Sequence, residues 1–183
     1  MPRKKTFSFK NLIHKNFRRL EQFIFLLKSL LTPRQFIYLS CVLVGISSAL
    51  AVIILKTFAH WVFKSSQKLD DILHLPFSNS TLPIIGIIIT VIIIKKVLDG
   101  SIEKGTSQIM YAVAKKRGIM PRKQMFAQII TSSFTVGMGG SAGLESPITI
   151  TGAAFGSNYA QNYRLSYKDR TLLLACGVAA GIG

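Results

Sequence analysis

Residues 139–147, Gly-Gly-Ser-Ala-Gly-Leu-Glu-Ser-Pro, interrupt an otherwise apolar segment of the chain. Between residues 124 and 163, Glu145 is the one charged side chain. The flanking stretches, residues 125–138 and 148–163, are each too short for a comfortable membrane crossing as a helix, and together they are too long. We therefore expect two helices that meet in a glycine-rich turn at membrane depth. Irregular backbone at that depth is tolerated where it is buried in protein or lines an aqueous cavity.

The start of the second of these helices is a candidate anion site. Pro147 suits the first helical position, where its missing N–H costs nothing. Unpaired backbone N–H groups and the partial positive charge of a helix start attract an anion, and Gly139, Gly140 and Gly143 allow close approach of the backbone. An ionised Glu145 would compete with a diffusible anion, and protonation would remove the competitor. An ionisable residue in a membrane segment is by default functional; the alternative is a loop glutamate in water.

The charge distribution predicts a membrane protein. The 183 residues include 23 Lys and Arg and 7 Asp and Glu, yet 49% are hydrophobic, which excludes disorder of the whole chain. Residues 36–55 carry no charge and are long enough to cross a hydrocarbon core of roughly 30 Å. Residues 82–98 form a second predicted crossing with two lysines near its end. Residues 171–183 are a third apolar stretch, and its run into the C-terminus predicts truncation in mid-helix.

The basic clusters predict an orientation. Nine basic residues and one acid precede the first crossing, which places the N-terminus in the cytoplasm. The loop over residues 56–81 is then outside, and residues 95–123, with eight basic residues and two acids, are inside. We expect residues 1–35 to form a basic amphipathic segment on the inner leaflet, ahead of a transmembrane domain over residues 36–183. Nucleic-acid binding is the rival interpretation of this basic arm, and the crossings that follow argue against it.

Two other site types have little support. Residues 137–142 fit the dinucleotide fingerprint G-x-G-x-x-A, but the helix predicted after them has no charged face, and the next acid beyond Glu145 is Asp169. Cys41 and Cys176 each lie in an apolar run, which argues against a disulfide scaffold or a metal site. We expect no cofactor and no bound metal.

Three motifs resemble one family. Residues 143–147, Gly-Leu-Glu-Ser-Pro, resemble the G-x-E-x-P motif of the CLC family of chloride channels and chloride/proton antiporters. Residues 152–156 match the glycine-bearing helix after that motif, and residues 169–181 resemble the next helix with its LLA-x-G-x-AAG run. The resemblance extends from about Phe36 to the end of the chain. It implies an all-α, polytopic fold, the first part of a CLC-type inverted repeat with broken helices that meet at mid-membrane.

The resemblance also implies roles for residues. Glu145 takes the place of the gating glutamate, whose ionised side chain blocks the external anion site and whose protonated form moves aside. The backbone amides and motif residues around it would bind the anion: Gly143, Leu144, Ser146, Pro147 and Ile148. The implied partners are chloride, a proton in antiporters, the lipid bilayer and, for a full-length chain, a second copy in a homodimer. The family's members are not enzymes.

The central anion site departs from the family pattern G-S-G-I-P-E. Alignment by spacing places Glu103-Lys104-Gly105-Thr106-Ser107-Gln108 there, so that Lys104 replaces the serine. A shifted alignment offers Thr106 or Ser107 as the hydroxyl instead. The candidate central site is therefore Lys104, Gly105, Thr106 and Ser107, and a solvated cytoplasmic cation is the alternative for Lys104.

The sequence thus predicts a chloride transport protein of CLC type, channel or antiporter, in the inner membrane of a bacterium. A truncated remnant without transport is the first alternative, because the family's second half of the pore lies beyond Gly183. A soluble nucleotide-binding or nucleic-acid-binding protein is the remote alternative.

Overall fold

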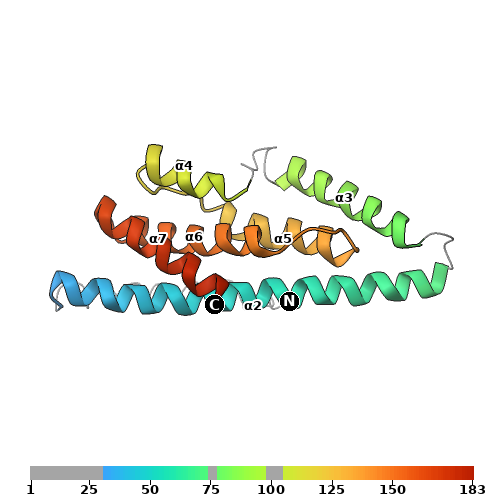
Figure 1. Ribbon diagram of the computed structural model, residues 1–183, viewed down its shortest axis with the longest axis horizontal. Coiled ribbons are helices and arrows are strands. Elements are labelled where there is room, and N and C mark those ends of the chain that lie inside the picture. Colours follow the sequence, from blue (N-terminus) through green and yellow to red (C-terminus); the bar gives the residue numbers. More distant parts are fainter. Residues whose placement is uncertain (1–30, 74–77, 98–104) are drawn as a thin grey trace, which may run out of the picture. The chain divides into compact units, whose positions relative to one another are not determined.

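The computed structural model describes residues 31–73, 78–97 and 105–183, and within them the regular structure is entirely helical. This confirms the all-α class. The chain divides into two compact units, Met1–Ser40 and Cys41–Gly183, and the second carries the features described below. The predicted amphipathic segment lies mostly outside the described residues, as does Lys104. The helices are α2 (Pro33–Leu73), α3 (Ser78–Val97), α4 (Ser107–Lys115), α5 (Gln124–Gly137), α6 (Glu145–Asn162) and α7 (Tyr167–Ile182) (Figure 1).

Helix α2 is much longer than the crossing predicted within it. It contains residues 36–55 but continues to Leu73, so the prediction of a loop from residue 56 is wrong for its first part. The end of the uncharged run limits the part of the helix that can lie in the hydrocarbon core, but it does not end the helix. Residues 56–73 contain no Gly or Pro that would interrupt the helical backbone. At 1.5 Å per residue the 41 residues span about 60 Å. Among the described residues, one segment, Pro33–Lys68, is long and apolar enough to cross a membrane.

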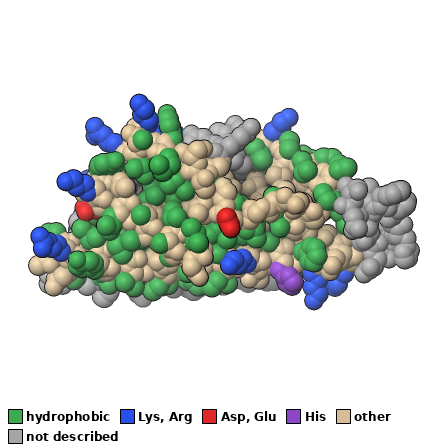
Figure 2. Space-filling model, in the orientation of Figure 1, with side chains coloured by type: hydrophobic (Ala, Val, Ile, Leu, Met, Phe, Trp, Pro, Cys, Tyr) green, Lys and Arg blue, Asp and Glu red, His purple; other side chains and the backbone are tan. Residues whose placement is uncertain are grey.

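The outward faces of α2 and α3 are apolar. Large hydrophobic side chains along both helices are more than 40% exposed: Val42, Ile46, Leu50, Ile53, Ile54, Trp61, Ile84, Ile87, Ile88, Val91 and Ile92. Hydrophobic side chains also cover much of the face seen in Figure 2, on which acidic side chains are sparse. An apolar surface of this extent suits lipid rather than water.

Helices α6 and α7 are in backbone contact. A Cβ added to Gly152 would lie 2.2 Å from the carbonyl oxygen of Gly177, and one added to Gly156 would lie 2.1 Å from that of Leu173. Glycine is therefore required at these crossing points, as in other closely packed membrane helices. In turn, α5 packs against α6 and α3 packs against α5; Figure 1 shows these helices.

Buried serine hydroxyls link α2 and α5 to their neighbours. Ser48 donates to the Gly177 carbonyl at 2.7 Å, and Ser66 donates to the Gly137 carbonyl at 3.1 Å. Ser133 of α5 donates to the Leu55 carbonyl at 3.4 Å. Each bond satisfies a polar group away from water, and together they fix α2 against α5 and α7.

Helix α4 lies in the region expected to be an inner loop. Its buried Ala112 belongs to an apolar cluster with Met120, Ile150, Ala153 and Leu174, so the helix packs on α6. This helix was not predicted from the sequence, because its apolar face is only nine residues long and lies among the basic residues of the segment 95–123.

Candidate anion site at the start of helix α6

Helix α5 ends in a defined C-terminal cap, which sets the course of the turn. Gly139 has φ +89°, a left-handed conformation, and its N–H donates to the Val136 carbonyl at 3.0 Å. The N–H of Gly140 donates to the Thr135 carbonyl at 2.9 Å. This pair of bonds is the Schellman motif. Gly139 and Gly140 are therefore explained by the end of α5, without an approaching ion.

Helix α6 begins at Glu145, with Leu144 as its N-cap residue. Pro147 is consequently the third helical residue, and the prediction that it would be the first is wrong. A proline is tolerated there because the first four N–H groups of a helix have no partner within it. The N–H of Ile148 already donates to the Leu144 carbonyl at 3.0 Å. The N–H groups of Glu145 and Ser146 precede that bond, so the helix itself gives them no acceptor.

Some residues of the motif pack into the core, and others are exposed. Ile148 is buried and Leu144 is partly buried, both in the cluster formed with Ala51, Val52, Leu55 and Ile129. The side chain of Glu145 is exposed, and a Cβ on Gly143 would meet nothing within 4 Å. The motif is thus held from one side by apolar packing, and it presents a carboxylate and open backbone on the other. This is the arrangement that an anion entering the helix start requires.

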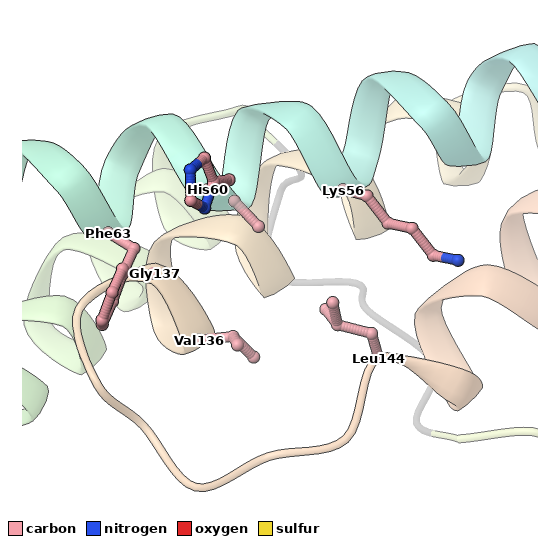
Figure 3. Close-up of a pocket in the computed structure, with 7 residues that line it drawn as sticks. Lys56, His60, Phe63, Val136, Gly137 and Leu144 are labelled. Atoms are coloured by element: carbon pink, nitrogen blue, oxygen red, sulfur yellow. The ribbon is translucent and has the colours of Figure 1, made fainter.

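A cavity of about 330 Å³ lies beside this helix start. It is lined from α2 by Lys56, Ala59, His60 and Phe63 and from the other side by Val136, Gly137 and Leu144. Figure 3 shows the Lys56 side chain leaving α2 on the side of Leu144, the residue that directly precedes Glu145. The structure therefore adds a cation to the site, which the sequence interpretation assigned only to an outer loop.

The second candidate site lies at the start of α4. Gly105 has φ +73°, Thr106 is the N-cap residue and Ser107 is the first helical residue, all three exposed. The Thr106 side chain makes no capping hydrogen bond. The N–H groups of Gln108 and Ile109 donate to the carbonyls of Gly105 and Thr106, and the role of these residues as a central anion site stays a prediction.

The chain is similar in sequence to one family of known proteins. Residues 85–183, more than half of the chain, match the family described as voltage-gated chloride channel. The chain belongs to this family. The matched residues include the glycine-rich turn, Glu145 and all of α4, α5, α6 and α7. No curated protein and no solved structure matched the chain.

Membership of the voltage-gated chloride channel family accounts for the apolar faces of α2 and α3. The protein is an integral membrane protein, its helical fold is part of a CLC-type fold, and the family's members are channels and transporters. The segment Pro33–Lys68 of α2, which lies outside the matched residues, is long and apolar enough to contain a membrane crossing.

The sequence interpretation did not assign Lys56 and His60 to the site. The signal available was their spacing: positions 56, 59, 60 and 63 recur at three and four residues, which places them on one helix face once α2 is known to continue past residue 55. The charge of Lys56 ended the uncharged run, and that same charge caused the residue to be taken for the beginning of a loop.

Proposed function

We propose that the protein transports chloride across the membrane and that Glu145 gates the pathway. The observation that carries the proposal is the start of α6 in a chain of the chloride channel family: Glu145 is its first residue and is exposed, and the N–H groups of Glu145 and Ser146 have no acceptor within the helix. The helix start favours negative charge from either source, the carboxylate or a chloride ion.

The gating step follows from competition for one site. Ionised Glu145 places its own negative charge at the helix start and excludes chloride by occupancy and by like-charge repulsion. A proton neutralises the side chain, which removes its electrostatic attraction to the N–H groups. Chloride then takes its place. Channels and proton-coupled antiporters share this step, so it holds for both classes. Gly143, Ser146 and the backbone around Leu144 form the walls of the site. We further propose that two copies assemble as a homodimer.

The test is chloride efflux from liposomes across a range of pH. Efflux should rise as the pH falls, and Glu145→Gln and Glu145→Ala should each make it insensitive to pH. Asp169→Asn is the matched control, because Asp169 is an acid at the start of α7, away from the motif. A pH dependence that persists in both Glu145 variants would refute the gating role.

A chain without transport of its own is the second candidate. The observation in its favour is the exposure of Glu145 and Gly143, whereas a conducting pathway encloses its ion. Purified chain that is helical by circular dichroism and yet gives no chloride efflux above protein-free liposomes at any pH would support this candidate. Efflux that depends on Glu145 would exclude it.

A further inference from the structure

The cavity between α2 and the glycine-rich turn combines one cation with several apolar side chains. Lys56 and His60 are its polar side chains, and Ala59, Phe63 and Val136 contribute apolar surface. Neither an Asp nor a Glu lines it. Lys56 forms no ion pair with the described residues of the chain. The cavity is open to its surroundings and the Lys56 side chain is exposed, so the lysine is free to attract a small anion and holds it weakly.

The cavity adjoins the gate. Leu144 lines it and is the N-cap residue of α6, so the cavity ends where the candidate anion site begins. The Lys56 side chain extends in that direction (Figure 3). An anion held by Lys56 would therefore lie in the cavity that Leu144, the residue before Glu145, also lines.

The volume of the cavity admits a small anion, and its charge favours one. A water molecule takes about 30 Å³ of liquid, so a cavity of about 330 Å³ holds a small ion together with part of its hydration shell. A single lysine offers one positive charge, and the His60 ring adds a hydrogen-bond donor. A small monovalent anion matches both features.

We propose that Lys56, with His60, forms a holding site for a chloride ion at the mouth of the pathway, distinct from the site at the start of α6. The supply of chloride from this site to Glu145 rests on the proposed function. The binding of chloride at Lys56 is independent of it. The site binds weakly and exchanges rapidly, because the ion keeps water around it and the lysine is exposed.

The experiment measures chloride binding directly, by the excess line width of the chloride NMR signal with the purified chain in nanodiscs of neutral phosphatidylcholine at neutral pH. Lys56→Gln should weaken binding about two- to fivefold, the range for an exposed charge pair, and His60→Gln should weaken it less. Lys56→Arg should retain it. Lys64→Gln is the matched control, since Lys64 is an exposed lysine on the same helix and does not line the cavity.

Three results would overturn the proposal. Binding by Lys56→Gln equal to that of the unmodified chain would do so, as would an equal loss in Lys64→Gln, which would indicate a general charge effect. Chloride binding by the unmodified chain that falls to the level of Lys56→Gln when anionic phosphatidylglycerol replaces half of the neutral lipid, while Lys56→Gln itself changes little, would assign Lys56 to lipid phosphate. Liposome efflux is measured separately, so a chain that binds chloride through Lys56 without transporting it would refute the proposed function alone.

Discussion

At the scale of single residues, Ser157 fixes the connection between α4 and α5. Its hydroxyl donates to the Gly118 carbonyl at 2.6 Å and accepts from the Met120 N–H at 2.9 Å. Gln161, one turn later, donates to the Met120 carbonyl at 3.1 Å. Gly118 is left-handed, with φ +71°, so the chain turns sharply where Ser157 holds it. One buried side chain of α6 thereby satisfies two backbone groups of a turn about forty positions earlier.

Ser157→Ala should lower the free energy of unfolding by about 1–3 kcal/mol, because it leaves a buried N–H and a buried carbonyl without partners. Denaturant titration of the detergent-solubilised chain, followed by circular dichroism, measures the effect. Ser65→Ala is the control, since the Ser65 hydroxyl is exposed and bonds only the Trp61 carbonyl of its own helix. Equal losses in the two variants would contradict this account of Ser157.

The sequence singles out Glu145 because a lone acid in an apolar segment is expensive and therefore conspicuous. It does not reveal which of the surrounding residues end helix α5 and which lie at the start of helix α6. Gly139 and Gly140 were expected to let the backbone approach an ion closely, and the structure shows that they close the end of α5. That division depends on which carbonyl each N–H reaches, a matter of backbone conformation that residue types alone leave open.

At the scale of elements, the α6–α7 crossing depends on the absence of side chains. Gly152 faces the Gly177 carbonyl, and Gly156 faces the Leu173 carbonyl, each too close for a Cβ. The same helix that carries Glu145 at its start is thus fixed by its neighbour along its length. The packing of α7 thereby contributes to the position of the candidate gate.

Gly156→Ala should destabilise the fold by about 1–3 kcal/mol, the usual cost of forcing a methyl group into a packed contact. Backbone atoms of Leu173 must move to admit it, because the nearest obstacle is a carbonyl oxygen rather than a flexible side chain. The midpoint of thermal unfolding in detergent reports the loss. Gly143→Ala should change stability by less than about 0.5 kcal/mol, since its Cβ enters open space. A drop as large in Gly143→Ala as in Gly156→Ala would show that the crossing is not the cause.

Helices α3 and α7 were predictable because each contains an apolar run, and α5 and α6 because a glycine-rich turn divides a stretch with a single charge. The length of α2 and the existence of α4 were not. Charged side chains such as Lys56 and Lys64 end an apolar window without ending a helix, and α4 has too few residues for its apolar face to stand out among the surrounding lysines.

At the scale of the whole molecule, the distribution of charge predicts orientation. Lysines and arginines are concentrated in residues 95–123, and that excess belongs on the cytoplasmic side. The cavity at Lys56 then lies toward the outside, at the end of the uncharged run of α2. Chloride that approaches from outside would meet Lys56 before Glu145, which is the order that the two proposed sites need.

This orientation is testable by cysteine labelling in intact bacterial cells. With Cys41 and Cys176 replaced by serine, Lys64→Cys should react with a membrane-impermeant maleimide added outside, and Lys115→Cys should react only after the cells are opened. Both lysines are exposed, so access to the reagent depends on the side of the membrane rather than on burial. The reverse pattern would place residues 95–123 outside, and the cavity at Lys56 would then face the cytoplasm. In that case chloride held at Lys56 would reach Glu145 from within the cell. A proton that arrives at Glu145 from outside would then not open the pathway to the chloride held at Lys56.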